Sequence, residues 1–156
     1  MDMLMALALS IGVLIAVWVK VGPMLFGSLA IAVPAGIVAW ACFFAAGGKT
    51  TGLQKTIAAN VSGVVWVWLA MTLINMTNMS NLAFVFVGIV AFFIVLQSKV
   101  ALLSFIPGAF CGAAITAASG AGTNVTANLM VALAMVVGAV LGYVSEMAGG
   151  MLAKKA

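Results

Sequence analysis

The side chains that could carry chemistry are few in this sequence and far apart along it. Asp2 and Glu146 are the only acidic residues, all six basic residues are lysines, and there is no histidine. General acid–base catalysis needs titratable groups gathered at one site, and histidine is the commonest metal ligand. The sequence therefore predicts a protein that is not an enzyme, with no catalytic residues, no metal site and no cofactor.

Two interpretations of Glu146 stay open. It follows Tyr143 near the C-terminal end of a long apolar run. It is either an interfacial residue at the end of a membrane helix or part of a solute pathway or proton relay. Ionisable residues are missing from the middle of the apolar runs. Since ion-coupled carriers bind the coupling ion through such residues, the sequence favours a passive route, an uncharged solute or no transport at all.

Five uncharged residues are further candidates for lining a solute pathway: Asn60, Asn128, Trp66, Pro34 and Pro107. The asparagines are expected in the first turns of the third and sixth helices. They lie either on the pathway or in an interhelical hydrogen bond or helix cap. Trp66 either constricts a pore, packs in the core or contacts another subunit. Each proline either frees a carbonyl for a polar path or only kinks a packed helix.

The composition indicates that these residues belong to a membrane protein. Hydrophobic residues make up 67% of the 156 residues and charged residues 5%, with a mean hydropathy of +1.37, whereas soluble domains contain about 25% charged residues. Barrel strands would alternate polar and apolar residues, but these runs are apolar on all sides. We predict a single domain over residues 1–156, an all-α integral membrane protein in the lipid bilayer. Its six transmembrane helices are expected at residues 3–21, 25–46, 56–74, 82–98, 100–118 and 126–147.

The lysines predict the orientation of this bundle. With six spans, the two termini and the loops near residues 47–55 and 97–99 share one side of the membrane. That side holds five of the six lysines, and only Lys20 lies opposite. By the positive-inside rule, both termini face the cytoplasm. Because there is no arginine and no basic stripe interleaved with aromatic residues, nucleic-acid binding is not supported.

Short sequence markers recur in the same order in the two halves. Val33-Pro34 is echoed by Ile106-Pro107, and Ala59-Asn60 by Ala127-Asn128. Each half has three spans, so the second half would enter the membrane from the opposite side. This predicts a 3+3 inverted repeat, about residues 3–75 and 82–148, with proline-broken second and fifth helices and a solute site near the midplane. The alternative is that a biased composition produces these echoes.

Small residues predict close helix packing. Gly108-xxx-Gly112 and Gly138-xxx-Gly142 give the fifth and sixth helices smooth faces. These faces serve contacts within the bundle or between protomers, so a homo-oligomer is one of the expectations. Cys42 and Cys111 lie inside apolar runs and are predicted to be small buried hydrophobes rather than a disulfide.

Three stretches resemble a known family. They are Ala39-Trp40 to Phe43-Phe44-Ala45, Ser62-Gly63-Val64-Val65-Trp66, and Gly88 through Gln97-Ser98-Lys99 to Gly108. They are similar to the YcdZ-type small inner-membrane proteins of bacteria, a family of unknown function. The resemblance covers about residues 5–145. It implies a bacterial inner-membrane location and supplies no reaction, substrate or site.

These observations lead to one functional prediction with two alternatives. We predict a membrane channel or facilitator for a small uncharged or weakly polar solute. The first alternative is a structural or assembly protein of the inner membrane without transport activity, whose small-residue faces bind partner helices. The second is a secondary transporter, for which Glu146 is the best candidate residue.

Overall fold

The chain folds into six α-helices in the part that the computed structural model describes, residues 1–27 and 29–153. That part contains no strand, so the predicted all-α architecture is confirmed. Short 3-10 turns lie at Ser80–Leu82, Gln97–Lys99 and Ala101–Leu103. In chain order the helices are α1 (Met3–Phe26), α2 (Ala32–Ala45), α3 (Lys49–Thr77), α4 (Ala83–Leu96), α5 (Ile106–Ala118) and α6 (Val125–Leu152).

The helices fall into two length classes. Four apolar segments are long enough to cross a membrane: α1, α3, α6, and α4 with its flanking turns, Ser80–Lys99. These spans agree with a multi-pass membrane protein. The other two helices are shorter, with 14 residues in α2 and 13 in α5. Each covers about 20 Å at 1.5 Å per residue, less than the roughly 30 Å of a hydrocarbon core.

The two candidate prolines begin the short helices instead of breaking them. Pro34 is the third residue of α2, and Pro107 is the second residue of α5. The prediction of proline-broken second and fifth helices is therefore wrong. The first N–H groups of a helix have no partner within it, and the proline ring holds φ near its helical value, so proline fits this position without disturbing the helix.

Several predicted helix boundaries are also wrong. α2 begins at Ala32 and not near residue 25, α5 begins at Ile106 and not near residue 100, and α6 continues to Leu152, beyond residue 147. α1 continues through Lys20 and Pro23 to Phe26, its last residue. Gly27 caps this end with a φ of 57°, a value that favours glycine. α3 begins at Lys49 and not near residue 56. Polar side chains at a helix end reach water at the membrane surface, so an apolar run can stop well before its helix does.

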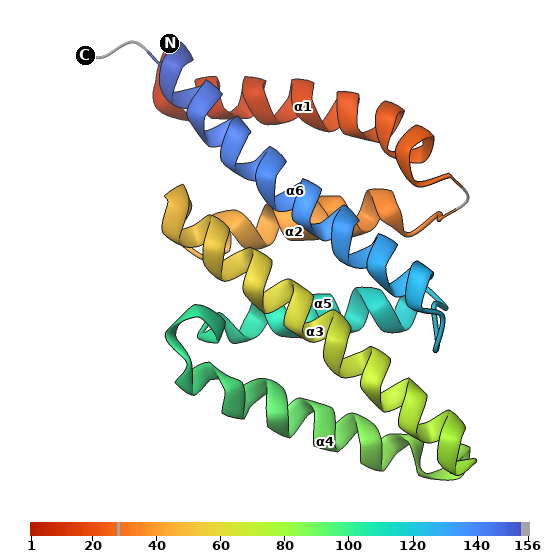
Figure 1. The fold of residues 1–156 in the computed structure, drawn as a ribbon. Helices are drawn as coiled ribbons and strands as arrows, with labels where there is room; N and C mark the ends of the chain where they lie inside the picture. The colour runs from red at the N-terminus through yellow and green to blue at the C-terminus, as the bar shows by residue number, and fades with distance from the viewer. Residues whose placement is uncertain (28, 154–156) are drawn as a thin grey trace.

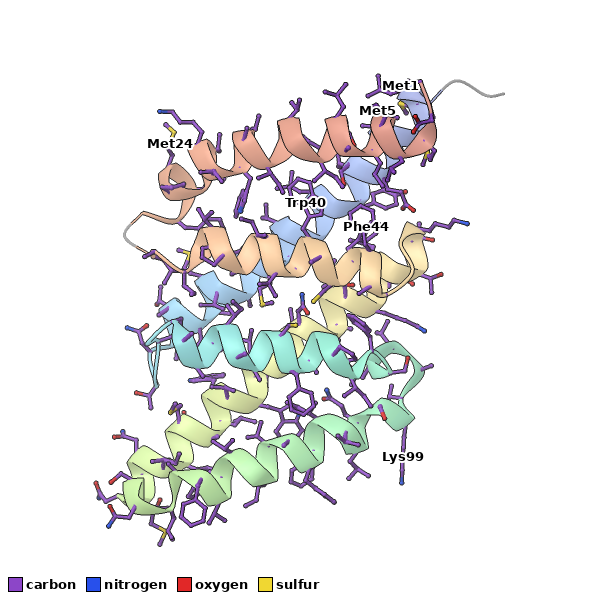
Figure 2. All side chains as sticks on the ribbon, turned by 180° about the vertical axis from the view of Figure 1, so that it is seen from behind. Met1, Met5, Met24, Trp40, Phe44 and Lys99 are labelled. Atoms are coloured by element: carbon purple, nitrogen blue, oxygen red, sulfur yellow. The ribbon has the colours of Figure 1, made fainter. Side chains whose placement is uncertain are left out.

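The helices lie side by side, as Figure 1 shows. The short helices α2 and α5 occupy the centre, α1 and α4 lie at the two edges, and the long helices α3 and α6 cross them diagonally. α2 makes its most extensive contact with α6, and α3 makes its most extensive contact with α5. In Figure 2, Met1 and Lys99 lie at one end of the bundle and Met24 at the other.

Glycines bring the inner helices into contact backbone to backbone. A Cβ added at Gly138 on α6 would overlap the carbonyl oxygen of Gly36 on α2. One added at Gly63 on α3 would overlap the carbonyl oxygen of Ala109 on α5, and one at Gly112 would overlap that of Asn60. The small-residue faces predicted for the fifth and sixth helices are thus used inside the bundle, where close approach strengthens helix packing in lipid.

This packing predicts different outcomes for two Gly→Ala changes. Alanine favours a helix over glycine by about 1 kcal/mol. Gly88→Ala on α4 adds its methyl group where nothing lies within 4 Å, so it is expected to preserve or raise stability. Gly112→Ala is expected to lower the free energy of unfolding by about 1–3 kcal/mol because it overpacks the α3–α5 contact. Unfolding in mixed micelles, followed by tryptophan fluorescence, measures both values, and equal effects would contradict this account.

Candidate functional site

Thr56 and Asn60 place unsatisfied polar groups inside the bundle. They lie one turn apart on α3, and both side chains are fully buried. Thr56 Oγ1 and both polar atoms of the Asn60 amide have no hydrogen-bond partner. A buried polar group left without a partner costs about 1–3 kcal/mol. These groups are therefore the described positions where a bound polar molecule would relieve the largest penalty.

Neighbouring residues on α3 define the surroundings of Asn60. Ala59 packs with Ala109 and Ala113 of α5. Val64 joins a cluster of α2 and α6 residues that includes Ala39 and Met135. Asn60 lies between these two contact faces of α3, so it sits where the four inner helices meet. The expectation that it lies in the first turn of its helix is wrong, because α3 begins at Lys49.

Asn128 occupies a different environment from Asn60. It does lie in the first turn of its helix, α6, as predicted. Its amide Nδ2 donates to the carbonyl oxygens of Asn124, at 2.8 Å, and Gly122, at 3.1 Å, while Oδ1 has no partner. The Asn124 side chain caps the same helix end by accepting from the Ala127 N–H at 3.0 Å. Asn128 thus secures the turn before α6, in agreement with the helix-cap alternative.

Glu146 binds the end of another helix. Its Oε2 accepts a hydrogen bond of 2.7 Å from the backbone N–H of Lys49, the first residue of α3. Gly48 beside it has a φ of 67°, and a Cβ there would lie 2.6 Å from Glu146 Oε1. A carboxylate at a helix N-terminus pairs with unsatisfied N–H groups and with the positive end of the helix dipole. This geometry supports the interfacial interpretation of Glu146.

Trp66 ties α3 to the turn that follows α4. Its Nε1 donates to Gln97 Oε1 at 2.9 Å, and Gln97 Nε2 donates to Ser62 Oγ at 2.9 Å. The indole also stacks on Phe93, with centroids 5.0 Å apart and planes at 12°. These contacts support a packing role for Trp66 and give no support to a pore constriction.

The two prolines do not form one site. α2 and α5 run in opposite directions through the centre of the bundle, so Pro34 and Pro107 lie toward opposite ends of it (Figure 1). Only Asn60 among the six predicted residues is fully buried with its whole polar group unpaired.

Sequence reasoning missed two buried residues that matter here. Thr56 begins an apolar run, but its spacing of four residues from Asn60 is a signal that the two share a helix face. Ser145 is fully buried, and its Oγ accepts from Trp40 Nε1 at 3.0 Å. Ser10 Oγ donates to the Ser145 carbonyl oxygen at 2.8 Å. These contacts join α1, α2 and α6, and no sequence signal paired residues so far apart.

Comparison with known proteins identifies the family. Residues 8–150 match the family described as "Protein of unknown function (DUF1097)". The chain belongs to this family. The DUF1097 match agrees with the resemblance to YcdZ-type proteins, because the chain is 32% identical over 166 residues to "Inner membrane protein YcdZ" of Escherichia coli (strain K12), covering 99% of this chain and 91% of that protein.

Two further relatives extend the comparison. The protein with the same name from Salmonella typhimurium is 30% identical over 160 residues, covering 99% of this chain and 92% of the relative. "Uncharacterized protein YahC" of Escherichia coli (strain K12) is 34% identical over 125 residues, covering 76% of this chain and 73% of the relative. No solved structure matches the chain.

The contact between Glu146 and α3 predicts a cap-like effect on stability. Glu146→Ala is expected to lower the free energy of unfolding by about 1 kcal/mol, because it removes the acceptor for the Lys49 N–H. Glu146→Gln keeps an acceptor oxygen and is expected to retain most of this stability. Unfolding curves of the two variants in mixed micelles check this, and an unchanged value for Glu146→Ala would contradict the capping role.

Proposed function

We propose that this DUF1097 member is a channel or facilitator for a small uncharged or weakly polar solute. The observation that carries the proposal is the unpaired, fully buried pair Thr56 and Asn60 at the meeting point of the inner helices. Their hydroxyl and amide offer donors and acceptors without charge, which suits a neutral solute. No chemical reaction is part of the proposal.

The proposal includes six membrane-embedded helices that form two inverted repeats, about residues 3–75 and 82–148. The spacing of buried residues supports the pairing of the short helices. On each short helix, five buried residues follow one another with the same spacing. They are Ala35, Gly36, Ala39, Trp40 and Phe43 on α2, and Gly108, Ala109, Gly112, Ala113 and Thr116 on α5. Any helix buried on one face shows this spacing, but this register also sets Pro34 opposite Pro107, as a repeat predicts.

The long inner helices support the same pairing. Five buried residues on each of these helices also share one spacing. They are Thr56, Ala59, Asn60, Gly63 and Val64 on α3, and Val131, Ala134, Met135, Gly138 and Ala139 on α6. The close contact of Gly138 with Gly36 then has its counterpart in the contact of Gly63 with Ala109. Exchanging the two halves therefore exchanges the α2–α6 crossing with the α3–α5 crossing.

This register changes one predicted equivalence. The markers in the sequence paired Asn60 with Asn128, whereas the buried positions pair Asn60 with Met135. The proposed site is therefore asymmetric, with a polar amide contributed by α3 and a thioether at the matching place on α6. Asn128 and the two prolines lie outside it.

A second candidate function is a structural or assembly protein without transport activity. The backbone contacts of Gly36, Gly63, Gly112 and Gly138 favour it, because they close the centre of the bundle. Under this alternative, Thr56 and Asn60 would bind buried water only. A secondary transporter is a weaker candidate, since the contact between Glu146 and the Lys49 N–H gives that carboxylate a structural role.

Replacing Asn60 by methionine tests the role of Asn60 in transport without an expected loss of stability. Asn60→Met copies the matching residue Met135 and removes a buried unpaired amide, so the folded state is expected to be as stable as the wild type or more so. Swelling of proteoliposomes in urea, glycerol and similar neutral solutes is expected to be faster with the wild type than with empty liposomes, and to fall to the empty rate with Asn60→Met.

The control is Gln54→Met, which also replaces an amide by a thioether, at an exposed position of α3, and is expected to keep permeability. Swelling of the wild type no faster than that of empty liposomes would count against a channel. Wild-type permeability in Asn60→Met would remove Asn60 from the pathway and leave the channel itself in place.

We also propose a bacterial inner-membrane location with both termini in the cytoplasm. The names of the YcdZ relatives and the lysines at the Lys99 end support it, although Lys154 and Lys155 lie outside the described residues. In a Cys42→Ala, Cys111→Ala background, a membrane-impermeant maleimide added to spheroplasts is expected to label Met24→Cys at once and Lys99→Cys only after lysis. The opposite order would reverse the orientation.

A further inference from the structure

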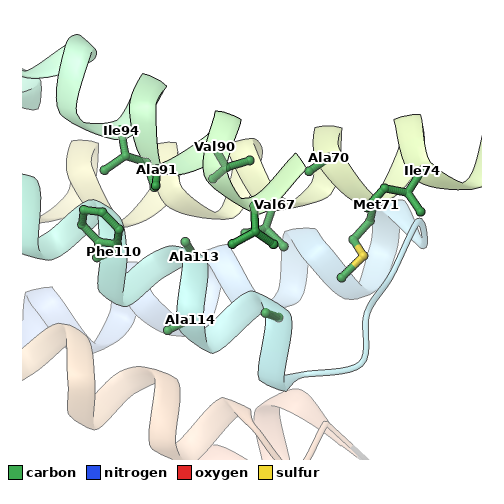
Figure 3. Close-up of a pocket in the computed structure, with 12 residues that line it drawn as sticks. Val67, Ala70, Met71, Ile74, Val90, Ala91, Ile94, Phe110, Ala113 and Ala114 are labelled. Carbon is green, nitrogen blue, oxygen red and sulfur yellow. The ribbon is translucent and has the colours of Figure 1, made fainter. Parts of the chain in front are cut away.

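α4 packs loosely against the rest of the bundle and leaves an apolar trench. Ile94 is its only buried residue, whereas α1, the other edge helix, buries Ala6, Ser10, Trp18 and Gly22. Figure 3 shows the trench between α3, α4 and α5, with Val67 and Met71 on one wall and Ile94 and Phe110 near one end. Its volume is about 240 Å³.

Small side chains keep the trench open. Ala91 on α4 and Ala113, Ala114 and Ala117 on α5 line it, and every other lining side chain is apolar. Water gains nothing in such a space because it finds no hydrogen-bond partners there. One turn of a helix about 10 Å across and 5.4 Å long occupies roughly 400 Å³. The trench holds about 240 Å³, too little for a further helix, whereas part of a flexible hydrocarbon chain suits both its volume and its apolar lining.

The trench continues into a polar mouth at one end. Met71 and Ile74 line both the trench and a second hollow of about 400 Å³. The other residues around this hollow are Asn75, Asn78, Ser80, Gly122 and Thr123. They belong to the C-terminal end of α3, the turn after it and the turn before α6. The mouth therefore offers uncharged donors and acceptors at the end of the bundle remote from Lys99.

We propose that the trench and its mouth form a binding site for one phospholipid of the surrounding bilayer. An acyl chain lies in the trench among Val67, Val90 and Ala117, and the head group lies at the mouth beside Asn75, Asn78 and Ser80. No charged side chain lines the mouth, so a zwitterionic head group is favoured over an anionic one. The site is independent of the proposed transport function, because Thr56 and Asn60 line neither hollow.

Lipid retention by matched variants tests the site. The full chain is purified from liposomes containing equal amounts of phosphatidylethanolamine and phosphatidylglycerol, and lipids retained are counted by native mass spectrometry. The wild type is expected to retain one phosphatidylethanolamine. Ala117→Leu fills the trench from an exposed position and is expected to weaken retention roughly tenfold, the effect of displacing about two methylene groups. Ala118→Leu, at the exposed neighbour outside the trench, is expected to match the wild type.

A second variant distinguishes a loss of lipid binding from a folding defect. Ala91→Leu fills the trench from α4 and is expected to weaken retention as Ala117→Leu does, with both variants eluting at the wild-type position in gel filtration. Equal retention by Ala117→Leu and Ala118→Leu would overturn the site. So would a wild-type preference for phosphatidylglycerol, recovery of a neutral isoprenoid instead of a phospholipid, or a cross-link between two copies through Ala117→Cys.

Discussion

Contact between backbones at two helix crossings is the constraint on which the rest of this structure depends. Lipid provides no hydrophobic force that drives one apolar helix against another, so association relies on dispersion between closely packed surfaces. Gly36 against Gly138, and Gly63 against Ala109, give the inner helices that proximity. Both crossings join a short central helix to a long diagonal one, α2 to α6 and α3 to α5. The contact between α3 and α6 then joins the two pairs.

The ends of the short central helices need hydrogen-bond partners for their backbone groups. A helix that ends inside a bilayer leaves backbone groups that lipid cannot solvate. Before α5, successive turns supply partners, because Val100 N–H donates to the Gln97 carbonyl and Leu103 N–H to that of Val100. At the start of α2, Ala32 N–H donates to the Leu29 carbonyl at 2.9 Å and Ala35 N–H to the Ile31 carbonyl at 2.8 Å. These contacts satisfy backbone groups near the starts of both short helices, as the proposed embedding of α2 and α5 in the bilayer requires.

The sequence predicts the class of this fold well and its detail less well. Composition and turn residues are enough to predict six helices, their order and the close packing through Gly112 and Gly138, because these depend on local chemistry. Helix ends such as Lys49 are not predicted, because polar residues mark where the chain reaches the membrane surface and not where the backbone hydrogen bonds of the helix end. The buried state of Thr56 and the contact of Ser145 with Trp40 depend on neighbours distant in the sequence, and helix register sets them.

Under the proposed inverted repeat, the two halves differ at one central position, and this difference supports the proposed function. α3 and α6 bury residues with the same spacing, and at one pair of matching positions α6 has Met135 where α3 has Asn60. Met135 joins an apolar cluster, which demonstrates that a thioether packs well in this architecture. An amide without partners costs about 1–3 kcal/mol that the thioether avoids. Folding alone therefore favours an apolar residue at both positions. A residue that works against folding at the centre of a bundle points to a role in function, and a neutral hydrogen-bonding group there suits a solute or water molecule of the same character.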